Sequence, residues 1–176
     1  MGPARLFVAV WPSPEVVRAV QSLPRPTGGT GARWTDPDQW HVTLRFLGEV
    51  TDEVAREVEG GVAGVAARLG PALAVVGPAT GCFGTSVLMV PVSGLQGLAA
   101  ATVEATAGWG AAPPERRPFV GHLTLARSRR RGPDLRGFAG QPVAASWTAS
   151  ELTLVRSSTS RTGARYEILR RFALSG

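Results

Sequence analysis

The chain has 176 residues, of which 44% are hydrophobic and 18% charged, a composition typical of a folded protein and not of a disordered one. Its net charge is +6, and all 19 basic residues are arginines. No apolar run approaches the length that a membrane helix needs, and a single cysteine excludes an internal disulfide. We therefore expect a cytoplasmic protein that does not bind a membrane.

The positive charge is concentrated in the second half of the chain. Up to residue 110 there are 7 arginines against 9 acidic residues, and from residue 111 onward there are 12 against 4. Because a guanidinium presents a fixed fork of donors to phosphate oxygens, this half favours a phosphate-bearing partner. The arginines at 129–131 are equally typical of a solvated surface loop, so charge alone leaves both interpretations open.

The first elements can be predicted from local patterns. A strand over Arg5–Trp11 opens the chain, which lacks the apolar core and cleavage site of a secretory signal. Serine and proline then favour a helix from Ser13 to about Leu23. A strand is expected at His41–Leu47, and a glycine-weakened helix from Thr51 to about Leu69. The later expected elements are strands at 73–76 and 86–92, a helix at 95–107, a strand at 122–126, a short helix near 134–138, and two long strands at 146–157 and 164–174.

This order of elements predicts the fold class. The second half partly repeats the scheme of the first, and no segment has the composition of an interdomain linker. We expect an α+β protein, mainly antiparallel, that forms a single domain over residues 1–176 with two similar lobes.

Two tetrapeptides carry the functional signal, His41-Val-Thr-Leu and His122-Leu-Thr-Leu, and they use both histidines of the chain. In a strand, residues two apart share a face about 7 Å apart, so Thr43 should point the same way as His41, and Thr124 the same way as His122. A single strand histidine is more often a structural residue. Two histidines with matching neighbours indicate one shared site.

Other histidine chemistry fits the sequence less well. A zinc site needs three or four ligands, and the two histidines have neither nearby cysteines nor an evident carboxylate cluster beside them. There is no phosphate-binding loop and no dinucleotide-binding glycine pattern. A Ser-His-Asp triad would leave the second His-Thr pair unexplained. We therefore expect no metal and no cofactor.

Two facing imidazoles suit in-line displacement at a phosphodiester. A neutral ring takes a proton from water, and a protonated ring gives one to the leaving alkoxide, because the intrinsic pKa of histidine lies near neutrality. Threonine hydroxyls and an arginine can donate hydrogen bonds to the non-bridging oxygens as charge develops on them. A cyclic phosphate is a natural substrate, since its ring is strained and its leaving oxygen stays on the same ribose.

At these motifs the sequence resembles the 2H phosphoesterase superfamily, and within it the RNA 2′,3′-cyclic phosphodiesterases once described as 2′-5′ RNA ligases. The likeness extends over nearly the whole chain. The segments that carry it are Arg5-Leu-Phe-Val-Ala-Val, His41–Val50, Phe119–Arg127, Glu151–Ser157 and Tyr166-Glu-Ile-Leu.

The resemblance implies a bilobal fold with pseudo-twofold symmetry, in which each lobe contributes one His-x-Thr strand to a central cleft. It also implies hydrolysis of RNA 2′,3′-cyclic phosphate ends to 2′-phosphomonoesters. On that model His41 is the acid toward O3′ and His122 the base for water, although the symmetry allows the reverse. Thr43 and Thr124 would hold the phosphate.

Two arginines are candidate phosphate ligands. Arg127 stands where the family has an arginine after the second motif, but strict alternation would point it away from His122, so the strand must end or bulge there. Arg45 is expected on the face of His41, where it either reaches the phosphate or is a charge at the rim. Gly121 replaces the proline of many relatives, a change expected to affect local stiffness and not the chemistry.

The expected partners are RNA with 2′,3′-cyclic phosphate ends or cyclic nucleotides, bound by a monomer. One alternative is another cyclic or 2′-5′ linkage, such as ADP-ribose 1″,2″-cyclic phosphate or 2′-5′ oligoadenylate. ATP-independent 2′-5′ ligation of RNA would follow as the reverse reaction. A different alternative is a non-catalytic RNA- or nucleotide-binding module, which would not require two matched proton-transfer groups.

Overall fold

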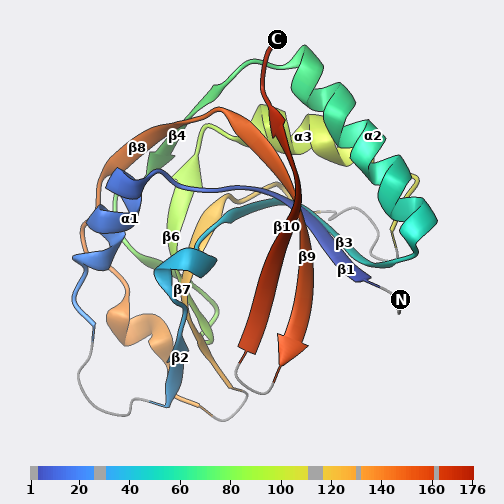
Figure 1. Ribbon diagram of the computed structural model, residues 1–176. Helices are drawn as coiled ribbons and strands as arrows, with labels where there is room; N and C mark the ends of the chain where they lie inside the picture. Colours follow the sequence, from blue (N-terminus) through green and yellow to red (C-terminus); the bar gives the residue numbers. More distant parts are fainter. Residues whose placement is uncertain (1–3, 26–30, 111–116, 130–131, 161–162) are drawn as a thin grey trace.

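The computed structural model describes residues 4–25, 31–110, 117–129, 132–160 and 163–176 (Figure 1). These residues form an α+β fold of helices and antiparallel strands, which confirms the predicted class. In the described ranges no helix is long and apolar enough to cross a membrane. The elements, in chain order, are β1 (Ala4–Val10), α1 (Pro14–Gln21), β2 (Ala32–Trp34), a 3₁₀ turn (Pro37–Gln39), β3 (Val42–Val50), α2 (Asp52–Arg68), β4 (Ala72–Val76), β5 (Gly81–Phe83), β6 (Val87–Ser93), α3 (Gln96–Ala105), β7 (His122–Ser128), a second 3₁₀ turn (Leu135–Phe138), β8 (Ala145–Ala149), β9 (Glu151–Ser160) and β10 (Gly163–Ala173).

Two sheets bring the two motifs together. The first has the strand order β10-β9-β1-β3, and the second has the order β2-β7-β6-β4-β8, with β5 paired to β6. Helix α1 packs against β8, and α2 packs against β9, β10 and α3 (Figure 1). The two strands that carry the motifs, β3 and β7, belong to different sheets and contact each other. The His-x-Thr strands therefore lie at a place where the two sheets meet.

Strand β1 separates the protein core from the site. Its residues Leu6, Val8 and Val10 are fully buried in the main hydrophobic cluster, which includes side chains from both sheets. The alternate residues Phe7 and Ala9 point to the opposite face. There they form a second, smaller cluster whose other members are Val155, Trp11, Tyr166 and Ile168. This aromatic face of the first sheet becomes one wall of the site.

The structure corrects some predicted elements. The expected long strand at 146–157 is two strands, β8 and β9, which belong to different sheets and separate at Ser150. The Ser150 carbonyl accepts a hydrogen bond from the Leu174 N–H at 2.9 Å. A chain that passes from one sheet to another keeps strand composition throughout, so local sequence does not mark the crossing. The strands β2 and β5, of three residues each, were not among the expected elements.

Candidate active site

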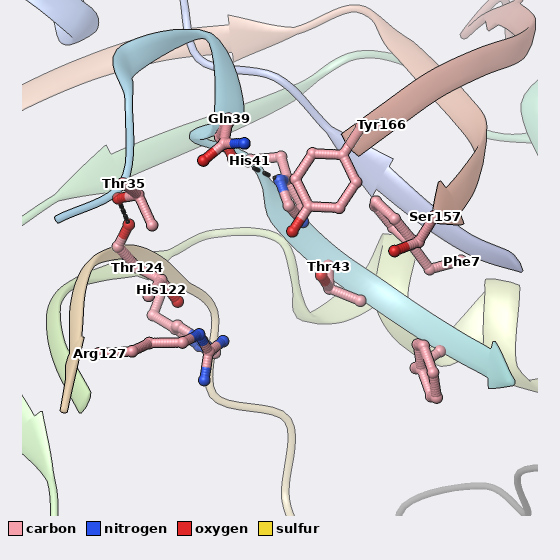
Figure 2. A pocket seen from close by; sticks show the side chains of 11 residues that line it. Phe7, Thr35, Gln39, His41, Thr43, His122, Thr124, Arg127, Ser157 and Tyr166 are labelled. Atoms are coloured by element: carbon pink, nitrogen blue, oxygen red, sulfur yellow. Dashed lines mark hydrogen bonds between the residues drawn. The ribbon is translucent and has the colours of Figure 1, made fainter. Parts of the chain in front are cut away.

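Both histidines line one cavity of about 220 Å³, which we call the histidine cavity (Figure 2). His41 immediately precedes β3, and His122 is the first residue of β7. Thr43, Thr124 and Arg127 line the same cavity, so the structure brings together five of the six residues singled out in the sequence. The remaining lining residues are Phe7, Thr35, Gln39, Phe46, Ser157 and Tyr166. Within the described ranges no cluster of three or more His, Cys, Asp or Glu side chains that could hold a metal ion is present.

The two imidazoles are held by the same hydrogen bond. His41 Nδ1 lies 2.7 Å from the carbonyl oxygen of Gln39, and His122 Nδ1 lies 2.9 Å from the carbonyl oxygen of Val120. In both cases the acceptor is the residue two positions before the histidine. Because a carbonyl oxygen can only accept, each Nδ1 carries the proton and donates it. Each Nε2 is thereby left as the atom that exchanges protons with a substrate.

His41 is enclosed by aromatic rings. Its ring stacks on Phe7 at a centroid distance of 4.8 Å and contacts Trp11 at 5.2 Å and Tyr166 at 4.9 Å. The Trp11 indole is itself fixed by a 3.0 Å hydrogen bond to the Thr153 hydroxyl. Burial lowers the pKa of His41 to about 4, since the charged ring loses its hydration, and the hydrogen bond to the Gln39 carbonyl offsets only part of this effect.

His122 has a different apolar neighbour, the edge-on ring of Phe83 at a centroid distance of 4.8 Å. Burial is again the main cause that lowers the pKa of His122, and the nearby Arg127 charge contributes in the same direction. The charges of His122 and Arg127 also lower the pKa of His41. Both rings are therefore neutral at pH 7 while the histidine cavity holds no anion.

A β-bulge follows each His-x-Thr sequence. In β3, Thr43 pairs with Ala9 and Arg45 pairs with Val8, so Leu44 is an extra residue between two consecutive partners. In β7, Thr124 pairs with Met89 and Ala126 with Leu88, and Leu125 is the extra residue. Each bulge shifts the alternation of its strand by one position. Consequently the fifth residue after each histidine, and not the fourth, returns to the face of the histidine cavity.

The bulges determine the positions of the two candidate arginines. Arg127, five residues after His122, lines the histidine cavity. The strand bulges before Arg127, as was expected for this arginine to face the site. The predicted position of Arg45 is wrong: its side chain is 4% exposed and is not part of the cavity lining. It lies opposite Val8, a residue of the main core, because the bulge at Leu44 breaks the alternation on which the prediction relied. Phe46 lines the histidine cavity instead.

The segment between β2 and β3 organises both motifs. The Thr35 hydroxyl donates to the Thr124 carbonyl at 2.6 Å, and the Thr35 N–H donates to the Leu125 carbonyl at 2.9 Å, so this residue holds the bulge in β7 (Figure 2). The same hydroxyl accepts from the buried Trp40 indole at 2.9 Å. Four residues later, Gln39 orients His41 through its carbonyl and donates to the Ala164 carbonyl at 2.7 Å through its side chain.

Sequence reasoning missed these supporting residues. Thr35 and Gln39 lie close before the first motif, but their partners are 89 and 125 residues away in the chain. Tyr166 offered a clearer signal, since it is the only tyrosine and lies in a segment that carries the family resemblance. Burial raises the pKa of Tyr166, whose ring packs edge-on against the His41 ring.

The comparisons with known proteins agree with this geometry. No curated protein sequence matches the chain. The family model described as LigT-like phosphoesterase matches residues 10–78, a range that includes the first motif. The structure of TT0787 of Thermus thermophilus has 27% sequence identity and a TM-score of 0.79, with 97% of each chain covered.

Structures of LigT from E. coli cover the whole of both chains. The apo form has 26% identity and a TM-score of 0.74, and the form complexed with 3′-AMP has 26% identity and a TM-score of 0.71. These matches extend over both motif strands, whereas the family model ends before β7. The chain is therefore similar to LigT-like phosphoesterases, in sequence over residues 10–78 and in fold over its whole length.

Proposed function

We propose that this chain hydrolyses 2′,3′-cyclic phosphates, at RNA ends or in nucleotides, to 2′-phosphomonoesters. The observation that carries the proposal is that His41 and His122, fixed in the same tautomer, line one cavity with Thr43, Thr124 and Arg127. In-line displacement at a phosphodiester needs two proton-transfer groups and donors for the non-bridging oxygens. The histidine cavity contains this set of groups.

The reaction begins as His122 Nε2 accepts a proton from a water whose oxygen attacks phosphorus. The P–O3′ bond breaks on the opposite side, and O3′ takes the proton that His41 Nε2 carried. The phosphate stays on O2′, and solvent returns a proton to His41 and removes one from His122. Throughout, the hydroxyls of Thr43 and Thr124 and the Arg127 guanidinium donate to the two non-bridging oxygens, which gain negative charge in the transition state.

The acid has to be protonated before the reaction, although the free site disfavours a charged ring. The pKa of His41 is about 4 without a ligand. A bound phosphodiester carries a negative charge, which stabilises an imidazolium and raises the pKa of both rings. The assignment of His41 as the acid follows the family resemblance and requires the bound phosphate to raise the pKa of His41 above that of His122.

Two further observations support a nucleotide or RNA substrate. E. coli LigT has been crystallised with 3′-AMP, which is a nucleoside phosphate, and with the phosphate anion alone. In this chain Arg33 lies opposite Arg127 across the β2–β7 pair, and both charges act on the nearby Tyr166 hydroxyl. Two cations close to Tyr166, which lines the histidine cavity, favour a substrate with more than one phosphate, such as an RNA end.

The experiment uses the purified protein in EDTA with 2′,3′-cyclic AMP and with RNA that ends in a 2′,3′-cyclic phosphate. Phosphorus NMR should show loss of the cyclic phosphate and formation of the 2′-phosphate. A protein that binds phosphate but converts neither substrate would contradict the proposal. The same panel contains 2′-5′ oligoadenylate and ADP-ribose 1″,2″-cyclic phosphate, and faster turnover of either would favour that linkage instead. RNA with a 5′-hydroxyl, added without ATP, tests the reverse ligation.

A further inference from the structure

A second hollow opens beside the histidine cavity, on the side of His122. It measures about 530 Å³ and shares Thr43, Phe46 and His122 with the histidine cavity. Its other walls come from β5, from α3 and from the segment at 117–120 that leads into β7. We call this hollow the apolar groove. A molecule whose phosphate lies between the histidines therefore lies next to the groove, with these three side chains bordering both hollows.

The apolar groove gathers exposed hydrophobic side chains. Phe46, Phe83 and Val120 all line it and are 45%, 38% and 52% exposed. In the described part of the chain the only other large hydrophobic residues with such exposure are Leu73 and Val75. Large apolar side chains that converge on a hollow beside a polar site are typical of a ligand-binding surface.

The opposite wall of the histidine cavity is less suited to a flat apolar ligand. Phe7, Trp11 and Tyr166 already pack against the His41 ring at centroid distances of 4.8 to 5.2 Å. Phe83 meets His122 only with an edge-on orientation, at an interplanar angle of 82°. Phe46, at the junction of the two hollows, has no aromatic neighbour among the ring contacts of the described residues.

We propose that the apolar groove binds the nucleobase of the nucleotide whose phosphate lies between the two histidines, by stacking on Phe46 and Phe83. The inference rests on the proposed function, since it assigns the base of that same substrate. It makes the protein selective for nucleoside phosphates over phosphates without a base. Stacking on an aromatic ring is tolerant of base identity, so all four bases should be accepted.

The test is binding of 2′-AMP, with inorganic phosphate as the probe that lacks a base. Calorimetry should show that 2′-AMP binds more tightly than phosphate, and that Phe83→Ala weakens 2′-AMP binding about tenfold. Phe83→Trp retains a stacking surface and should restore the affinity. Leu73→Ala, which removes an exposed apolar side chain outside the groove, is the matched control and should bind 2′-AMP as the wild type does.

Nuclear Overhauser contacts give a second readout that does not depend on a variant. Adenine H2 and H8 of bound 2′-AMP should contact the ring protons of Phe46 and Phe83. Contacts to Tyr166 instead, or equal affinities of the wild type for 2′-AMP and phosphate, would overturn the assignment. Neither measurement requires turnover. The assignment of the apolar groove to the base can therefore be rejected even if cyclic phosphates are hydrolysed, and it can be supported even if they are not.

Discussion

Phe46 and Arg127 occupy equivalent positions, each five residues after one of the two histidines, and both line the histidine cavity. Each reaches it because a bulge, at Leu44 or Leu125, shifts the alternation of its strand. The site is therefore matched in its histidines and threonines but asymmetric at this position, where one strand presents an aromatic ring and the other a guanidinium. The difference assigns charge binding to β7 and apolar contact to β3.

Arg127→Ala should weaken the binding of inorganic phosphate by about 10- to 100-fold, the range expected for lost hydrogen bonds to a charged group. Calorimetry in low salt measures the change. Arg127→Lys should recover only part of the affinity, because an ammonium lacks the planar fork. The control is Arg129→Ala, an exposed arginine two residues later that is outside the cavity lining. Unchanged phosphate affinity in Arg127→Ala would show that this guanidinium does not hold the anion.

Anion binding should be coupled to proton uptake by the histidines. Burial lowers the pKa of His41 to about 4 and also lowers that of His122, so the free rings are neutral at pH 7. A bound anion raises both pKa values, and protons taken up on binding make the affinity increase as the pH falls. Sulfate is the suitable probe because its own charge is constant over this range.

Imidazole resonances in NMR titrations report the two pKa values directly. We expect a pKa near 4 for His41 in the free protein and a higher pKa for both rings in saturating sulfate. His41→Ala should reduce the pH dependence of sulfate affinity. Equal titration curves with and without sulfate would mean that the rings do not face the bound anion.

Thr35→Val should impair the site through the bulge that it holds. The substitution keeps the shape of the side chain but leaves the Thr124 carbonyl and the Trp40 indole without their 2.6 Å and 2.9 Å partner. We expect a loss of about 1–3 kcal/mol in unfolding free energy and weaker phosphate binding well below the melting temperature. Thr35→Ser keeps the hydroxyl and should restore phosphate affinity. A variant that loses stability but binds phosphate normally would make Thr35 purely structural.

Gly121 is required for close packing before the second motif. A Cβ there would lie 2.4 Å from the Val92 carbonyl oxygen and 3.3 Å from the Phe119 ring. Gly121→Ala should therefore lower the unfolding free energy by about 1–3 kcal/mol, as overpacking does. Gly97→Ala, in α3 with open space around it, is the control and should stabilise the helix by up to about 1 kcal/mol. Denaturant unfolding compares the two, and equal stabilities would contradict the packing argument.

Local sequence was sufficient to predict the fold class and the strands that carry the motifs, whereas the convergence of the motifs was inferred from their matching neighbours and from the family resemblance. Each His-x-Thr segment is rich in strand-forming residues. Each threonine shares a face with the histidine two residues before it, because side chains in a strand alternate with a period of two. The starts of two helices were also predicted from local sequence. Ser13 and Thr51 both accept hydrogen bonds from the first turn of their helices, as N-cap residues do.

The features that the sequence did not predict depend on distant contacts. The bulge at Leu44 is set by pairing with β1, and it moves Arg45 to the core side. The roles of Thr35 and Gln39 depend on β7 and β10, which are far away in the chain. Side chains alternate between the two faces of a strand only up to a β-bulge, and the pairing with neighbouring strands decides where a bulge forms. For Arg127 the family resemblance predicted a phosphate ligand while strict alternation pointed the side chain away from His122, and this conflict indicated an irregular strand. For Arg45 alternation already placed the side chain on the face of His41, so nothing indicated the bulge.

The central claim is that the imidazoles of His41 and His122 act on the same phosphorus atom. Its most direct test is single-turnover hydrolysis of 2′,3′-cyclic AMP in EDTA by the wild type, His41→Ala and His122→Ala. Circular dichroism should first show that both variants are folded. We expect each variant to be slower by about 10²- to 10⁴-fold, the usual contribution of a general acid or base. A wild-type rate in either folded variant would contradict the claim.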